Sequence, residues 1–239
     1  MPHGKPECPC SYGAACILFF VRYPVAGMVK TRLAKSIGDD AAARLYSSFV
    51  EQLLGGLRHL AHETGATLRI VYDGASVDFA FSQKSLSYTQ LSKQSFLQNW
   101  LGPYSYVPQS GGDIGERMES AMSQAFADGF ERVLLLGSDI PDFPMEHVEM
   151  ALTALHSSPM TINPTEDGGY CLIGLTRQSF LLLSPILFHD MPWSTEDVFS
   201  QTMQRVNNIL LQSSFSSPHI LPAWYDIDTI EDLEKLQKD

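Results

Sequence analysis

Two aspartates of this chain stand where predicted strands give way to loops. Asp139 follows the apolar run 132–136 in the stretch LLLGSDIP, and Asp228 follows another strand candidate in the stretch YDIDTIEDL. Carboxylate oxygens in such places suit Mg²⁺ or Mn²⁺, which can bridge them to the phosphate oxygens of a ligand. Both also have a structural explanation, because Asp139 can cap the turn before Pro141 and Asp228 with Glu231 resembles a helix capping box. We take the two aspartates as candidate ligands of one divalent cation.

A basic loop follows the first apolar run of the chain. In the stretch YPVAGMVKTRL, Gly27 lets backbone amides approach an anion, and Lys30 and Arg32 supply positive charge for phosphate. The P-loop pattern GxxxxGK(S/T) and the dinucleotide fingerprint GxGxxG are both absent. The loop is therefore either an unusual phosphate-binding segment or a basic surface loop.

Three polar segments offer further ligand-binding groups. The stretch QSGGDIGER (109–117) is either a helix entrance that binds an anion or a plain loop. In NPTEDGGY (163–170), the adjacent Gly168 and Gly169 indicate a tight turn or a backbone that lies close to a ligand. The stretch MPWST (191–195) is either a helix cap with a packed tryptophan or an aromatic wall with hydroxyls for a polar ligand.

The charge balance narrows the class of ligand. The 239 residues carry a formal net charge of −11, and no basic stripe interleaved with aromatic residues appears, which argues against DNA or RNA as the partner. An acidic protein that binds a phosphorylated small molecule needs well-placed cations or a divalent metal to offset repulsion. The absence of GxSxG argues against a serine hydrolase of that type.

Cysteine usage and the first apolar run favour the reducing cytoplasm. Cys8 and Cys10 lack a second pair or a histidine partner at zinc-ligand spacing, and Cys16 and Cys171 lie in apolar runs and are expected to be buried. The run 14–21 is too short for a membrane span and has no signal-peptide cleavage site in the right place. We expect a cytoplasmic protein without membrane insertion.

The pattern of apolar and polar residues predicts the elements that must hold these side chains. Strands are expected at 16–21, 67–72, 104–107, 132–136, 160–164, 170–175 and 220–225. Helices are expected from Asp39 to Gly65, near 96–100, at 115–130 and 144–156, from Ser194 or Thr195 to 211, and from about Asp228.

The alternation of strands and helices predicts an α/β three-layer fold with a mainly parallel sheet. In such sheets ligands bind at the carboxyl ends of the strands, where most of the polar segments fall. Residues 14–239 are expected to form one domain after a loose leader, 1–13, with an irregular excursion at 75–101.

Six segments, in this order, resemble a known family. The matching pieces are FVRYPVAGMVKTRLA (20–34), QSGGDIGERM (109–118), LLLGSDIPDFP (134–144), NPTEDGGYCLIGL (163–175), MPWSTEDVF (191–199) and YDIDTIEDL (225–233). Together they look like the bacterial DUF2064 family, glycosyltransferase-like proteins of the nucleotide-diphospho-sugar transferase superfamily. That superfamily is related to the molybdenum-cofactor and coenzyme F420 nucleotidyltransferases. The resemblance implies a glycosyltransferase A-type fold that binds a nucleotide at the sheet's carboxyl edge, usually with Mg²⁺ or Mn²⁺.

Residue roles follow from the resemblance together with the strand-end positions. The resemblance implies that Asp139 and Asp228 hold the metal. The predicted nucleotide-binding residues are Arg22, Gly27, Lys30, Arg32, Asp73, Gln109 and Gly112. The predicted substrate-binding residues, where the glycine pair would let the chain turn under the substrate, are Asp167, Gly168, Gly169, Tyr170, Trp193, Ser194 and Thr195.

The reaction type stays open at this point, because GSD stands at 137–139 where many glycosyltransferases have DxD. The leading expectation is a metal-dependent transferase that uses a nucleotide-diphospho-sugar and a small-molecule acceptor. The alternatives are a nucleotidyltransferase that moves NMP from an NTP to a phosphorylated small molecule, and a non-catalytic nucleotide-binding protein.

Overall fold

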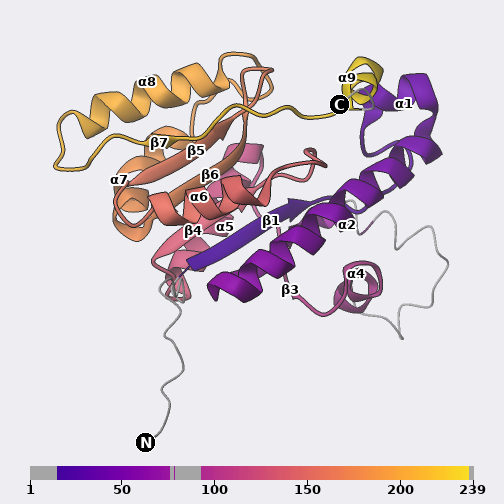
Figure 1. Ribbon diagram of the computed structural model, residues 1–239, viewed down its shortest axis with the longest axis horizontal. Coiled ribbons are helices and arrows are strands. Elements are labelled where there is room, and N and C mark those ends of the chain that lie inside the picture. Colours follow the sequence, from indigo (N-terminus) through magenta and orange to yellow (C-terminus); the bar gives the residue numbers. More distant parts are fainter. Residues whose placement is uncertain (1–14, 76–77, 79–92, 237–239) are drawn as a thin grey trace, which may run out of the picture.

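A seven-stranded sheet forms the centre of the computed structural model, which describes residues 15–75, 78 and 93–236 (Figure 1). The strands are β1 Ala15–Val21, β2 Thr67–Tyr72, β3 Ser105–Pro108, β4 Arg132–Leu136, β5 Met160–Pro164, β6 Tyr170–Thr176 and β7 His219–Ile220. Their order is β3-β2-β1-β4-β6-β5-β7, and β6 runs antiparallel to both of its neighbours while the other pairs are parallel. The predicted α/β fold with a mainly parallel sheet is confirmed.

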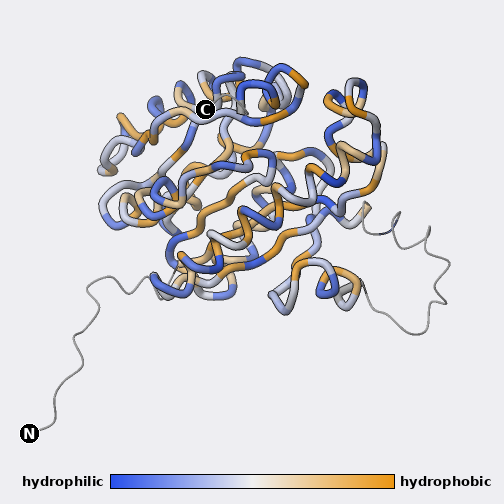
Figure 2. The backbone as a smooth tube through the Cα atoms, turned by 45° about the vertical axis from the view of Figure 1, so that its right-hand side comes forward, coloured by the Kyte–Doolittle hydropathy of each residue, from blue (hydrophilic) through white to orange (hydrophobic). Residues whose placement is uncertain are grey.

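Helices cover both faces of the sheet. The described helices are α1 Thr31–Ile37, α2 Asp39–Thr64, α4 Lys93–Leu101, α5 Ile114–Ala127, α6 Met145–Ala154, α7 Arg177–Leu187, α8 Val198–Leu210 and α9 Ile230–Leu236. Ile17 and Phe19 of β1 pack with α2 and α6 on one face, and Cys16 and Leu18 pack with α5, α7 and α8 on the other. Because β1 is buried on both faces, it reads as a continuous apolar run, and Figure 2 shows hydrophobic colour along the central strands.

Two of the described helices were not predicted from the sequence. The short α1 begins after Lys30, whose backbone is left-handed and whose side chain makes no capping bond, so the usual start signal is missing. At the start of α7, Thr176 and Ser179 form a capping box, but Pro185 lies inside the helix and weakens the helical pattern.

Several predicted boundaries differ from the structure by one to three residues, and two differ in ways that have a bearing on the site. The strand expected at 220–225 is only His219–Ile220 plus an isolated bridge at Trp224, because Pro222 in between has no backbone N–H for the ladder. The helix expected to begin at Ser194 or Thr195 starts at Val198.

The predicted leader 1–13 and part of the excursion at 75–101 lie outside the described residues, and the division into leader and one domain stays a prediction. The helix expected near 96–100 is confirmed as α4. Within the described ranges, no helix combines the length and the hydropathy that a membrane crossing requires.

Candidate functional site

A cavity of about 490 Å³ lies at the carboxyl ends of β1 and β4. The strand that follows β1 in the chain, β2, lies on one side of the cavity. The strands that follow β4, which are β5 and β6, lie on the other side. The neighbouring strands β1 and β4 therefore form the switch point of the sheet, where open α/β sheets have a crevice for ligands. Phe20, Val21 and Arg22 line the cavity from β1, and Ser138 and Asp139 line it from the segment after β4.

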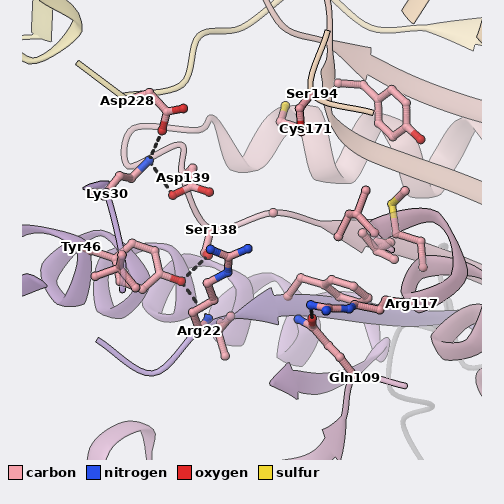
Figure 3. A pocket seen from close by; sticks show the side chains of 18 of the residues that line it. Arg22, Lys30, Tyr46, Gln109, Arg117, Ser138, Asp139, Cys171, Ser194 and Asp228 are labelled. Carbon is pink, nitrogen blue, oxygen red and sulfur yellow. Dashed lines mark hydrogen bonds and ion pairs between the residues drawn. The ribbon is translucent and has the colours of Figure 1, made fainter. Parts of the chain in front are cut away.

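The two aspartates predicted as metal ligands meet at one lysine. Lys30 Nζ lies 2.5 Å from Asp139 Oδ1 and 3.0 Å from Asp228 Oδ1 (Figure 3). The lysine side chain is only 2% exposed, whereas the side chains of Asp139 and Asp228 are 53% and 42% exposed. Burial alone would lower the pKa of Lys30, but the charges of both aspartates and the hydrogen bonds to them outweigh burial and raise it. The ammonium is therefore held charged between the two carboxylates.

Asp228 is available to Lys30 because other residues cap the following helix. Thr229 and Asp232 make reciprocal capping bonds, in which Asp232 Oδ2 also accepts the backbone N–H of Asp228. The predicted capping box of Asp228 with Glu231 is therefore wrong. The backbone N–H of Ile227 donates to the carbonyl of Asp139 at 3.1 Å, which fixes the C-terminal segment beside the end of β4.

A buried phenol supports the floor of the cavity. Tyr46 of α2 accepts the backbone N–H of Arg22 at 2.9 Å, and its hydroxyl lies 2.8 Å from Ser138 Oγ. Burial raises the pKa of the Tyr46 phenol, and the nearby charge of Asp139 adds to the rise, so Tyr46 stays neutral and able to donate. This network ties α2 to the ends of β1 and β4.

A third basic group enters the cavity from the opposite side. In Figure 3, Arg117 and Gln109 lie on the far side from Lys30, and the side chain of Arg22 lies between these groups. Arg117 Nη1 lies 3.5 Å from Gln109 Oε1, and Gln109 Nε2 donates to the carbonyl of Val71 at 3.4 Å. Both contacts are long, so these bonds hold the two side chains only weakly. Ile114 and Met118, on the same face of α5, add an apolar wall.

The predicted glycine pair forms a turn that packs against protein. Gly168 has a φ of +88°, and a Cβ added there would lie 2.0 Å from the carbonyl oxygen of Glu196. The carboxylate of Asp167 accepts bonds from Thr165 Oγ1 at 2.6 Å and from the N–H of Gly169 at 3.1 Å. Asp167, Gly168 and Gly169 do not line the cavity, so their role in substrate binding stays a prediction without direct support from this geometry.

The segment before α8 places one of its three predicted residues in the cavity. Ser194, with a φ of +65°, lines the cavity together with Tyr170, which begins β6. Trp193 instead packs against Gly115 of α5, where an added Cβ would lie 2.7 Å from the indole ring. Thr195 donates to the carbonyl of Pro192 and does not cap α8, so the predicted cap at Ser194 or Thr195 is wrong.

Among the remaining residues predicted to bind the nucleotide, one lines the cavity and three do not. Arg32 lines the cavity beside Lys30, and its binding of a nucleotide stays a prediction. Gly27, Asp73 and Gly112 are not part of the lining, and the N–H of Gly112 donates to Glu116 Oε2 at 2.6 Å within the start of α5. Nucleotide binding by these three residues stays a prediction.

The electrostatics of the cavity contrast with those of the whole protein. The lining holds four basic side chains and two acidic ones, although the chain has a formal net charge of −11. The basic residues are Arg22, Lys30, Arg32 and Arg117, and the acidic residues are Asp139 and Asp228. Positive charge concentrated in a concave site attracts anions and raises their local concentration.

Two further titratable groups border this region. Burial, followed by the charges of Asp167 and Asp228, raises the pKa of the Asp226 carboxyl to about 6. Cys171 was expected to be buried but is half-buried and lines the cavity, and desolvation still raises the pKa of its thiol to about 12. A thiol with such a pKa is a weak nucleophile, so Cys171 is not a candidate for covalent catalysis.

Comparison with known proteins identifies the relatives of this chain. The family model "Uncharacterized protein conserved in bacteria (DUF2064)" matches residues 57–195. The chain belongs to the DUF2064 family. A crystal structure of a candidate nucleotide-diphospho-sugar transferase from Desulfovibrio desulfuricans G20 is 40% identical, with a TM-score of 0.78, and the match covers 94% of this chain and 86% of that one. The resemblance seen in the six sequence segments is confirmed.

More distant structures share the fold. A cytidylyltransferase from Leptospira borgpetersenii serovar Hardjo-bovis is 15% identical, with a TM-score of 0.55 and coverage of 94% of this chain and 85% of that one. The 4-diphosphocytidyl-2C-methyl-D-erythritol synthase from Anaerococcus prevotii DSM 20548 is 13% identical, with a TM-score of 0.52 and coverage of 94% and 99%. A search of curated proteins gave no match.

Sequence reasoning missed three side chains that shape the cavity, Tyr46, Arg117 and Ser138. Helical periodicity could have indicated Arg117, because it lies three residues after Ile114 and one before Met118, and both of these residues line the cavity. Tyr46 gave no comparable signal, since a tyrosine on the buried face of a long helix usually marks core packing.

Proposed function

We propose that this protein is a metal-dependent transferase that binds a nucleotide-diphospho-sugar in the switch-point cavity and transfers the sugar to a small-molecule acceptor. The observation that carries the proposal is the basic lining of this one cavity in a strongly acidic protein. A volume of about 490 Å³ lies within the range of small-molecule sites. The 40%-identical relative, named as a candidate nucleotide-diphospho-sugar transferase, supports the same class.

Different polar side chains of the cavity can bind different parts of the nucleotide. Arg22 directly follows β1 and Arg32 lies in the first turn of α1, where they can donate to the diphosphate. Gln109 and Arg117 can bind the base or ribose on the far side of the cavity, against the apolar wall of α5. Among the described residues, neither Arg22 nor Arg117 has a carboxylate within ion-pair distance, so both charges are available to a ligand.

The aspartates suit the divalent cation that the proposal requires. Asp139 Oδ1 and Asp228 Oδ1 converge on one point, as their shared contact with Lys30 Nζ indicates. Hard cations such as Mg²⁺ and Mn²⁺ prefer oxygen donors of this kind and leave positions for phosphate oxygens and water. Such an ion would neutralise charge on the leaving diphosphate. No group of three or more His, Cys, Asp or Glu suited to a metal occurs among the described residues. Phosphate oxygens and water would therefore supply further ligands beside the two aspartates.

Nucleotidyl transfer from an NTP is the second candidate. A triphosphate would engage more of the four basic side chains than a diphosphate would. Cytidylyltransferases also share this fold, at low sequence identity. In this reaction Arg22, Arg32 and Lys30 would stabilise the phosphate groups while the acceptor phosphate attacks the α-phosphorus of the NTP and pyrophosphate leaves.

Product analysis separates the candidates. The purified protein is incubated with Mn²⁺ or Mg²⁺ and a panel of nucleotide-diphospho-sugars, and released nucleoside diphosphate is measured. Parallel reactions contain NTPs and sugar phosphates, and pyrophosphate is measured. Arg22→Met serves as the variant with a weakened site. Nucleotide binding without either product would refute both transfer reactions and leave a nucleotide-binding protein.

A further inference from the structure

The point between Asp139 and Asp228 is occupied by the ammonium of Lys30. Its Nζ is within 3.0 Å of one oxygen of each carboxylate, and its side chain is almost completely shielded from solvent (Figure 3). A divalent cation bound by the same two oxygens would lie roughly 2.0–2.6 Å from each of them. The ammonium and the metal therefore cannot occupy this point together.

The surrounding backbone keeps the two carboxylates in place while the lysine can move. The bond from Ile227 N to the carbonyl of Asp139 joins their two segments, and the capping contacts of Asp232 hold the backbone of Asp228. Because the backbone segments that carry both aspartates are held, and the side chain of Lys30 has four flexible carbons, Lys30 is the group that moves when a metal binds.

A displaced ammonium needs another anion. A buried charge without a partner is strongly unfavourable. The affinity for a metal in the absence of phosphate is therefore lowered by the free energy needed to remove Lys30 from both carboxylates. Lys30 lines the same cavity as Arg22 and Arg32, where the phosphates of a nucleotide would lie. A phosphate in the cavity offers the ammonium a new partner at short range.

We propose that Lys30 and a divalent cation exchange at the Asp139–Asp228 pair, and that the exchange couples metal binding to phosphate binding. The proposal rests on the proposed function for the identity of the phosphate ligand, but the exchange itself concerns the lysine and the metal alone. Because coupling between two binding events is reciprocal, the metal strengthens phosphate binding by the same factor as phosphate strengthens metal binding.

Titration of Mn²⁺ alone tests the exchange. Calorimetry in phosphate-free buffer compares the wild type with Lys30→Met, which removes the competing charge, and with Lys35→Met, which removes the same charge from an exposed position on α1. We expect Lys30→Met to bind Mn²⁺ at least about fivefold more tightly than the wild type, the lower end of typical couplings. Lys35→Met should match the wild type. Equal or weaker binding by Lys30→Met would overturn the proposal.

A measurement on the wild type does not depend on folding of the variant. Amines are acetylated with acetic anhydride, and peptide mass spectrometry quantifies Lys30 and, as an internal control, Lys35. We expect Mn²⁺ to increase labelling of Lys30 severalfold, added inorganic phosphate to reverse the increase, and Lys35 to stay constant. Protection of Lys30 at saturating Mn²⁺ would overturn the exchange, and an increase that phosphate leaves unchanged would overturn the coupling.

The outcome is distinguishable from failure of the proposed function. If neither the wild type nor Lys30→Met binds Mn²⁺, the exchange is overturned. Transfer from a nucleotide without added metal would then still support a transferase, but one that does not depend on a metal. If Mn²⁺ displaces Lys30 but no nucleotide binds, the exchange stands and the proposed function fails.

Discussion

Replacing Gly168 by alanine is expected to destabilise the protein by about 2–5 kcal/mol. With a φ of +88°, an added Cβ costs roughly 1–2 kcal/mol in backbone conformation. The same atom would lie 2.0 Å from the carbonyl oxygen of Glu196, a backbone atom that cannot rotate away. The hairpin between β5 and β6 or the segment before α8 must then shift, and overpacking of this kind costs roughly 1–3 kcal/mol more.

Gly169→Ala is the matched control for this prediction. Its backbone is not in the left-handed region, and an added Cβ would meet side-chain atoms of Thr165 at 3.1 Å and Asp167 at 3.3 Å. We expect its stability to stay within about 1 kcal/mol of the wild type. Urea denaturation of both variants measures the difference. Equal losses would refute the steric argument, and a stable Gly168→Ala protein that no longer binds nucleotide would show that the turn contacts the ligand.

Three further predictions concern single side chains of the cavity and core. Tyr46→Phe should cost about 1–3 kcal/mol in urea denaturation, because it removes the partner of Ser138 and leaves buried polar groups unpaired. Arg117→Met should weaken nucleotide binding roughly tenfold or more without altering the far-ultraviolet circular dichroism spectrum, and unchanged affinity would exclude a charged contact. Burial raises the pKa of the Cys16 and Cys171 thiols to about 12, so iodoacetamide at pH 8 should label them only after unfolding, as peptide mapping will show.

The sheet could be predicted because its strands carry their own signal. The ranges 67–72, 132–136 and 160–164 agree with the structure. The last two runs are almost entirely buried, whereas 67–72 is buried only at Ile70 and Val71, and all three are bounded by polar or turn-forming residues. The antiparallel direction of β6 has no such signal in its own residues. It follows from the tight turn at Gly168, which joins β6 to β5 as a hairpin and brings Tyr170 to the same edge as the carboxyl ends of the parallel strands.

The cavity could be predicted in part, by the rule that polar strand ends gather at one edge. Arg22, Lys30, Arg32 and Asp139 lie there as expected, because β1 and β4 are parallel neighbours. Their partners could not be predicted, because contacts such as Lys30 with Asp228 join residues far apart in the chain. Sequence reasoning assigned the lysine to phosphate and the aspartates to metal, and it had no means of placing the lysine between them.

The capping residues after β7 show how a shift of one residue changes the chemistry of the site. A carboxylate that accepts backbone N–H groups at a helix start has fewer oxygen lone pairs for a cation. Here Thr229 and Asp232 make the capping contacts, and Asp232 receives the N–H of Asp228 as well. Asp228 is thereby released from capping and directed at Lys30, 198 residues earlier in the chain. The sequence allowed Asp228 either to cap the helix or to bind a cation. In the structure Thr229 and Asp232 take the capping role, and Asp228 therefore remains available to form a carboxylate pair with Asp139.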